Sequence, residues 1–145
     1  MRISMKSDYA LRAMMELAAT YGNRSLQTSE IAARRAIPES YLEQLLTTLR
    51  KAGFVASSRG PQGGHSLALH PSQVTAGDLV KALDGPVIVL DCLDSSDACQ
   101  HSNPCVLREL WLEVRGAVEG TLDRITIEEL SSRQAVADGG LMYHI

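Results

Sequence analysis

The sequence has no long hydrophobic run. No stretch of the 145-residue chain approaches the roughly 18 consecutive apolar residues of a membrane-spanning helix, which excludes an integral membrane protein. The first residues also lack the apolar core and the small-residue cleavage site of a secretory signal. We therefore expect a cytoplasmic protein with no membrane partner, built as one domain with a small appendage.

Cysteine is scarce, and the usual redox motifs are missing. The chain has three cysteines, with neither a Cys-x-x-Cys pair nor the four-cysteine spacing of a ferredoxin. No nucleophile with an activating base stands out either. These absences disfavour an electron carrier or a redox enzyme, and we expect no enzymatic activity. An odd number of cysteines also excludes a closed disulfide framework.

The three cysteines lie close together in a polar segment. Cys92, Cys99 and Cys105 fall within fourteen positions, among aspartate, serine, glutamine, histidine and asparagine residues. Three small buried hydrophobic side chains would not have such neighbours. The pattern therefore predicts a ligand-binding loop over residues 86–105.

The net charge of −3 conceals an asymmetry between the two halves. Residues 1–70 carry nine basic and five acidic side chains, whereas residues 71–145 carry five basic and twelve acidic ones. An acidic chain with a basic half can still bind nucleic acid through that half.

The basic half contains a helix-turn-helix pattern. Helical spacing of apolar residues predicts a helix over residues 7–21, and Thr28 or Ser29 is expected to cap a short second helix. Pro38 is well placed to open a third helix over residues 39–52. Its apolar face is Leu42, Leu45, Leu46 and Leu49, and its polar face includes Ser40, Glu43 and Gln44.

A hairpin follows the third helix. Residues 54–55 and 66–69 are typical of short strands, and residues 59–64 are typical of a turn. The turn glycines permit close approach to another surface, and Arg59 beside them can enter a DNA minor groove. The expected fold is therefore mainly α: a winged helix-turn-helix domain over residues 1–85 with a small two-stranded wing.

The second half predicts helices and an assembly surface. Thr75 and Asp78 form a capping box for a helix that Gly85 and Pro86 end. A long helix then starts at residues 103–104. Its continuous apolar stripe favours pairing with a second copy of the chain over packing on the chain's own first half. We expect a dimerisation helix and a short terminal helix over residues 106–130, and a flexible tail over residues 131–145.

Four segments together resemble the Rrf2 family. They are the first ten residues, residues 40–45, residues 49–54 and the turn at residues 59–64, and the resemblance covers roughly residues 1–130. The family consists of dimeric bacterial winged-helix transcription regulators, including an IscR- and NsrR-like branch that binds iron–sulfur clusters. The resemblance implies binding to double-stranded operator DNA through Thr28, Ser40, Tyr41, Glu43, Gln44, Arg59, Gly63 and Gly64. A carboxylate such as that of Glu43 can accept a hydrogen bond from cytosine N4.

The resemblance also implies an iron–sulfur cluster with two or four irons on Cys92, Cys99 and Cys105. The candidates for a fourth ligand are Asp8 of a second subunit and His101, because Arg108 stands where the IscR-like branch has a histidine. The implied function is that of a homodimeric regulator whose DNA affinity is controlled by an iron–sulfur cluster, which senses redox state, nitric oxide or the supply of iron and clusters. The alternative is a cluster-free regulator that uses its cysteines as a zinc site or a thiol switch.

Overall fold

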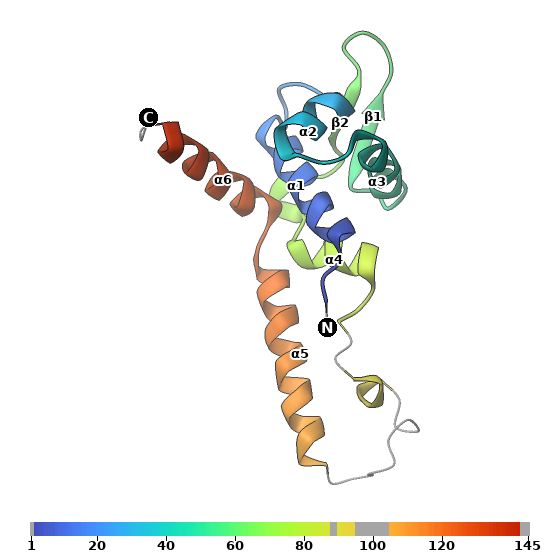
Figure 1. The fold of residues 1–145 in the computed structure, drawn as a ribbon, viewed down its shortest axis with the longest axis vertical. Helices are drawn as coiled ribbons and strands as arrows, with labels where there is room; N and C mark the ends of the chain where they lie inside the picture. Colours follow the sequence, from blue (N-terminus) through green and yellow to red (C-terminus); the bar gives the residue numbers. More distant parts are fainter. Residues whose placement is uncertain (1, 88–89, 95–104, 143–145) are drawn as a thin grey trace.

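The computed structural model describes residues 2–87, 90–94 and 105–142, and the side chains up to residue 139. It has a helical body that carries a hairpin, and one long helix that extends away from the body (Figure 1). The hairpin and the start of the long helix lie at opposite ends of the long axis of the molecule. Within the described residues, no helix is both long and apolar enough to span a bilayer.

The first helix forms the centre of the core. α1 spans Met5–Ala19, two residues earlier at each end than expected, because Ser4 caps it by accepting a hydrogen bond from the Ser7 N–H at 3.2 Å. Its buried face packs against residues from every other part of the body. These core residues include Ala10, Ala13, Met14, Leu17, Leu26, Ile31, Leu42, Leu46, Leu49, Val74, Leu79 and Ile127.

The helix-turn-helix is present as predicted, with one correction. α2 spans Thr28–Arg35 and α3 spans Glu39–Lys51. The N-cap of α2 is Gln27, not Thr28 or Ser29, because the side chains of Gln27 and Glu30 form a reciprocal capping box. Ala36 closes α2 with a left-handed backbone, at φ 52°, which turns the chain toward α3.

The predicted wing is a two-stranded antiparallel sheet. β1 covers Val55–Ser58, and β2 covers Gly64–Leu67. Val55 pairs with Leu67, and Ser58 pairs with Gly64. A further bridge joins His65 to Leu26, just before α2, so that the hairpin is fixed to the helix-turn-helix.

The next elements connect the body to the long helix. After the short 3-10 helix η1 (Pro71–Gln73), α4 spans Ala76–Asp84 behind the predicted Thr75–Asp78 capping box. A second 3-10 helix, η2, covers Asp91–Leu93, and α5 covers Val106–Arg124. Cys105 is the N-cap of α5, and its backbone is extended. α5 contains no buried residue in the single chain.

The last helix corrects the expected ending of the chain. α6 spans Ile127–Met142. The prediction of a short terminal helix within residues 106–130 is therefore wrong, and the expected tail over residues 131–145 is helical as far as Met142. α6 packs on α1: Ile127 is buried in the core, and the Ser131 hydroxyl donates to the Met15 carbonyl at 3.1 Å. These tertiary contacts stabilise a segment whose own helical pattern is weak.

Candidate functional site

α3 exposes a polar face beside the hairpin. Ser40, Tyr41, Glu43 and Gln44 are all exposed, while the four leucines of the opposite face are buried. The Tyr41 ring and the Tyr9 ring on α1 form a T-shaped pair, with a centroid separation of 5.7 Å. The side chains that the sequence analysis assigned to a recognition helix therefore share one accessible helix face.

The hairpin places Arg59 in solvent but buries the two glycines. Arg59 is exposed immediately after β1. Gly63 and Gly64 are buried, so the close approach that these two glycines allow is to the chain itself, whereas the sequence analysis expected it to be to another surface. A Cβ on Gly64 would lie 2.5 Å from the Leu26 carbonyl oxygen, and one on Gly63 would overlap the Ser58 carbonyl oxygen. The Gln27 amide also donates to the Gly63 carbonyl.

His65 joins the hairpin to the helix-turn-helix. Its Nε2 is 3.0 Å from the Thr28 hydroxyl, and its Nδ1 is 3.0 Å from the Ser57 hydroxyl. Burial lowers the pKa of His65, the positive charge of Arg50 lowers it further, and the negative charge of Glu43 raises it. The neutral imidazole is thus favoured, with a hydroxyl partner at each nitrogen.

Sequence reasoning did not identify this junction. Thr28 was assigned to DNA, whereas its half-buried hydroxyl pairs with His65 inside the chain. A local signal was available for Ser57 alone, because the register of the hairpin places it opposite His65. Thr28 lies 37 residues before His65, on another element. The bridge between Leu26 and His65 could not be predicted either, because the two residues are too far apart in sequence for any local pattern to connect them.

The two described cysteines lie on either side of a segment that the structure does not describe. Cys92 in η2 and Cys105 at the start of α5 are free, half-buried thiols. Cys99 and His101 lie outside the described residues. Two arginines of α5 contact the η2 region: Arg108 donates to the Cys92 carbonyl at 3.5 Å, and Arg115 pairs with Asp94 at 2.9 Å.

Asp8 is not brought to the described cysteines within one chain. Its carboxylate pairs with Arg12 on the next turn of α1 at 2.8 Å. Among the residues that the structure describes, no three histidine, cysteine, aspartate or glutamate side chains gather to form a metal site. Within the described residues, Asp8 therefore joins neither Cys92 nor Cys105 in a group of ligands.

α5 carries exposed apolar side chains at helical spacing. Leu107, Leu110 and Val114 are 61%, 45% and 36% exposed, and Val106 beside them is 76% exposed. The other members of the predicted stripe, Trp111, Val118 and Leu122, are half-buried. An apolar helix face without a partner in its own chain is a typical protein interaction surface.

Comparison with known proteins agrees with this architecture. Residues 3–133 match the Rrf2 family, described as iron-dependent transcriptional regulators. The HTH-type transcriptional regulator CymR of Bacillus subtilis is 37% identical over the full length of both chains. IscR of Cronobacter sakazakii is 36% identical over 95% of this chain and 85% of its own length.

A solved structure supports the same assignment. The structure of CymR, described as the global cysteine regulator of B. subtilis, superposes with a TM-score of 0.78 and 39% identity. The match covers 92% of this chain and 98% of that one. The mainly helical fold with a two-stranded hairpin is thus that of winged-helix regulators. The chain belongs to the Rrf2 family of DNA-binding transcriptional regulators.

Proposed function

We propose that the chain acts as a homodimer on a palindromic operator, and that an iron–sulfur cluster controls its DNA affinity. The observation that carries the DNA-binding part is the exposure of Ser40, Tyr41, Glu43 and Gln44 on one face of α3, together with the exposure of Arg59 in the hairpin that follows α3. A helix of this kind reads base edges in the major groove, and a wing arginine suits the minor groove. Thr28, Gly63 and Gly64 support these elements from inside.

The chemistry of the cysteine segment, residues 92–105, fits an iron–sulfur cluster. Thiolates are the preferred ligands of such clusters, and Cys92 and Cys105 are free thiols at the two ends of the segment that contains Cys99. Cys105 stands at the N-cap of a 19-residue helix, and Cys92 lies in η2 before the undescribed part of the segment. We propose these three cysteines as ligands, with Asp8 of a second subunit or His101 as candidates for the fourth. A bound cluster supplies a centre that responds to redox state or nitric oxide.

The chain connects the cysteine segment to the body through α5. The contacts of Arg108 and Arg115 join η2 to the first half of α5. At its other end, the Ala76 N–H donates to the Ile125 carbonyl, and the Ile127 N–H donates to the Val74 carbonyl, both at 2.8 Å. A displacement of η2 is therefore transmitted along a stiff helix to the base of α4, and from there to the orientation of the body.

An anaerobic visible spectrum with iron and sulfide analysis tests the cofactor. We expect absorption bands in the native protein and their loss in Cys92→Ala. The DNA-binding part is tested separately by fluorescence anisotropy, with an operator selected from random DNA. Arg59→Ala should weaken binding by about tenfold, and salt-insensitive binding without sequence preference would contradict the proposal.

A cluster-free regulator is the second candidate. It is favoured by the full-length similarity to CymR, whose solved structure is described as that of a cysteine regulator. Here Cys92, Cys99 and Cys105 would hold zinc or react directly as thiols. A colourless native protein that contains zinc, or one that takes up no iron on reconstitution, would replace the first candidate by this one.

A further inference from the structure

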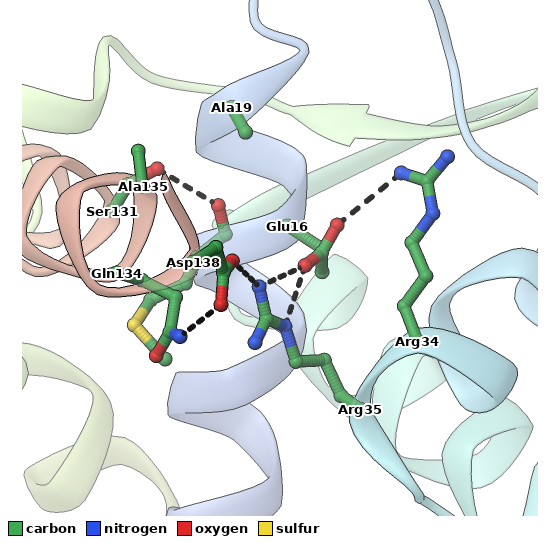
Figure 2. Close-up of a pocket in the computed structure, with 9 residues that line it drawn as sticks. Glu16, Ala19, Arg34, Arg35, Ser131, Gln134, Ala135 and Asp138 are labelled. Carbon is green, nitrogen blue, oxygen red and sulfur yellow. Dashed lines mark hydrogen bonds and ion pairs between the residues drawn. The ribbon is translucent and has the colours of Figure 1, made fainter. Parts of the chain in front are cut away.

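A cavity of about 390 Å³ lies between α1, α2 and α6 (Figure 2). Its lining includes no residue of α3 and neither Cys92 nor Cys105. We infer that this cavity binds a small zwitterion, namely a free α-amino acid with an apolar side chain. Its volume is within the range of sites for small ligands.

The cavity presents both signs of charge from different helices. Arg34 and Arg35 come from the end of α2, Asp138 comes from α6, and Glu16 of α1 lies between them (Figure 2). The Glu16 side chain is 7% exposed, and both guanidinium groups contact its carboxylate. A ligand with a single charge would be repelled by the groups of the same sign, whereas a zwitterion can satisfy both.

The two acidic side chains of the cavity, Glu16 and Asp138, differ in how firmly their arginine partners hold them. Glu16 is buried between its two arginines and serves as a fixed anchor. Asp138 is 53% exposed and reaches Arg35 only at 3.5 Å, while its other oxygen accepts a hydrogen bond from the Gln134 amide at 2.9 Å. An incoming ammonium group can therefore replace Arg35 as the partner of Asp138. The ligand carboxylate then takes the place of Asp138 on the guanidinium of Arg35, so that every charge remains paired.

The rest of the cavity is lined by small or apolar groups. Met15, Ala19 and Ala135 supply the apolar wall. The Ser131 hydroxyl is already used, since it donates to the Met15 carbonyl. The lining thus favours an aliphatic or thioether side chain on the ligand over a charged one.

The position of Arg35 connects ligand binding in the cavity to the orientation of α3. Arg35 is the last residue of α2, and its carbonyl accepts a hydrogen bond from Arg12 at 3.4 Å. The left-handed turn at Ala36 follows and leads into α3. A ligand that replaces Asp138 on Arg35 thus acts on the turn that sets the direction of α3.

The test is calorimetric titration of the full chain with L-leucine, L-valine and L-methionine, and it uses neither DNA nor a cluster. At least one of them should bind. Its N-acetyl and amide derivatives, which each lack one charge, should bind about tenfold more weakly or less. Asp138→Asn should weaken binding by a similar factor, and Glu128→Gln, an exposed change on α6 outside the cavity, should leave it unchanged.

Two results would overturn the inference. One is the absence of heat with all three amino acids up to about 10 mM. The other is equal binding of the N-acetyl or amide derivative, which would show that paired charges are not recognised. The comparison of derivatives uses the native chain alone, so it decides the question even if Asp138→Asn fails to fold.

Discussion

His65 makes the stability of the hairpin junction depend on pH. Burial and Arg50 hold its pKa below the ordinary 6.5, so the unfolded chain binds a proton more readily than the folded chain. The stabilisation is therefore fully present above pH 6.5 and is lost as the pH falls through the folded-state pKa. Urea denaturation at a series of pH values should show a smaller decline on acidification for His65→Gln than for the native chain. Parallel declines would contradict this assignment.

Gly64 is required for a close approach as well as for its backbone angle. Its φ is +148°, and an added Cβ would meet the Leu26 carbonyl at 2.5 Å. Gly22 has φ +79° with open space around it, so it serves as a matched control. Gly22→Ala should cost about 1 kcal/mol of backbone strain, and Gly64→Ala about 3 kcal/mol or more because the hairpin must also shift. Equal losses in urea denaturation would show that the contact with Leu26 does not matter.

Individual side chains differ in how well the sequence predicts them. The Thr75 capping box and the leucine face of α3 depend on residues three or four apart, and both were predicted correctly. Glu16 could not be predicted in the same way. Its partners lie 18 and 19 residues away on another helix, and nothing local distinguishes it from a solvent-exposed glutamate.

At the level of elements, Glu16 joins α1 to α2. Replacing it with glutamine removes the charge that two arginines share, one of them only 20% exposed. Glu16→Gln should therefore lower the free energy of unfolding by about 2 kcal/mol. Glu129→Gln is the control, because its pair with Arg133 on the surface of α6 is exposed on both sides and should be worth about 0.5 kcal/mol or less. Similar values for the two variants in urea denaturation would rule out a special role for Glu16.

α6 shows why tertiary contacts limit prediction from sequence. Residues 134–142 contain two glycines and no apolar repeat, which argued for an irregular tail. The helix is stabilised instead by the packing of Ile127 in the core, the bond from Ser131 to α1 and the contact of Asp138 with Arg35. The partners of Ser131 and Asp138 lie more than 100 residues away in sequence, beyond the reach of any local pattern.

For the whole molecule, the sequence predicted a winged-helix body and a long helix with an apolar stripe, in the correct order. What it could not supply is how they join. The Thr75–Thr126 bridge is flanked by two backbone hydrogen bonds, which join the start of α4 to the junction between α5 and α6. Residues 76–125 therefore begin and end at the same place on the body, and α6 packs on the body again after α5. α5 extends along the long axis of the molecule (Figure 1), and Leu107, Leu110 and Val114 of its apolar stripe stay exposed.

Exposure of that face leads to a prediction about assembly. Leu107, Leu110 and Val114 lie within one stripe of α5, and none of them is buried in the single chain. If a second copy covers the stripe, Leu110→Glu places a charge in an apolar interface, and dimerisation should weaken by about a hundredfold or more. The body does not depend on Leu110, so the circular dichroism spectrum should remain that of the native chain.

Sedimentation velocity over a range of concentrations measures this effect. The native chain should sediment as a dimer and Leu110→Glu as a folded monomer, while Glu109→Gln on the opposite side of α5 should remain dimeric. A dimer that persists in Leu110→Glu would place the subunit contact elsewhere. Because two recognition helices on one operator need a fixed separation of about one helical turn of DNA, the monomer should also bind a palindromic operator no better than a single half-site.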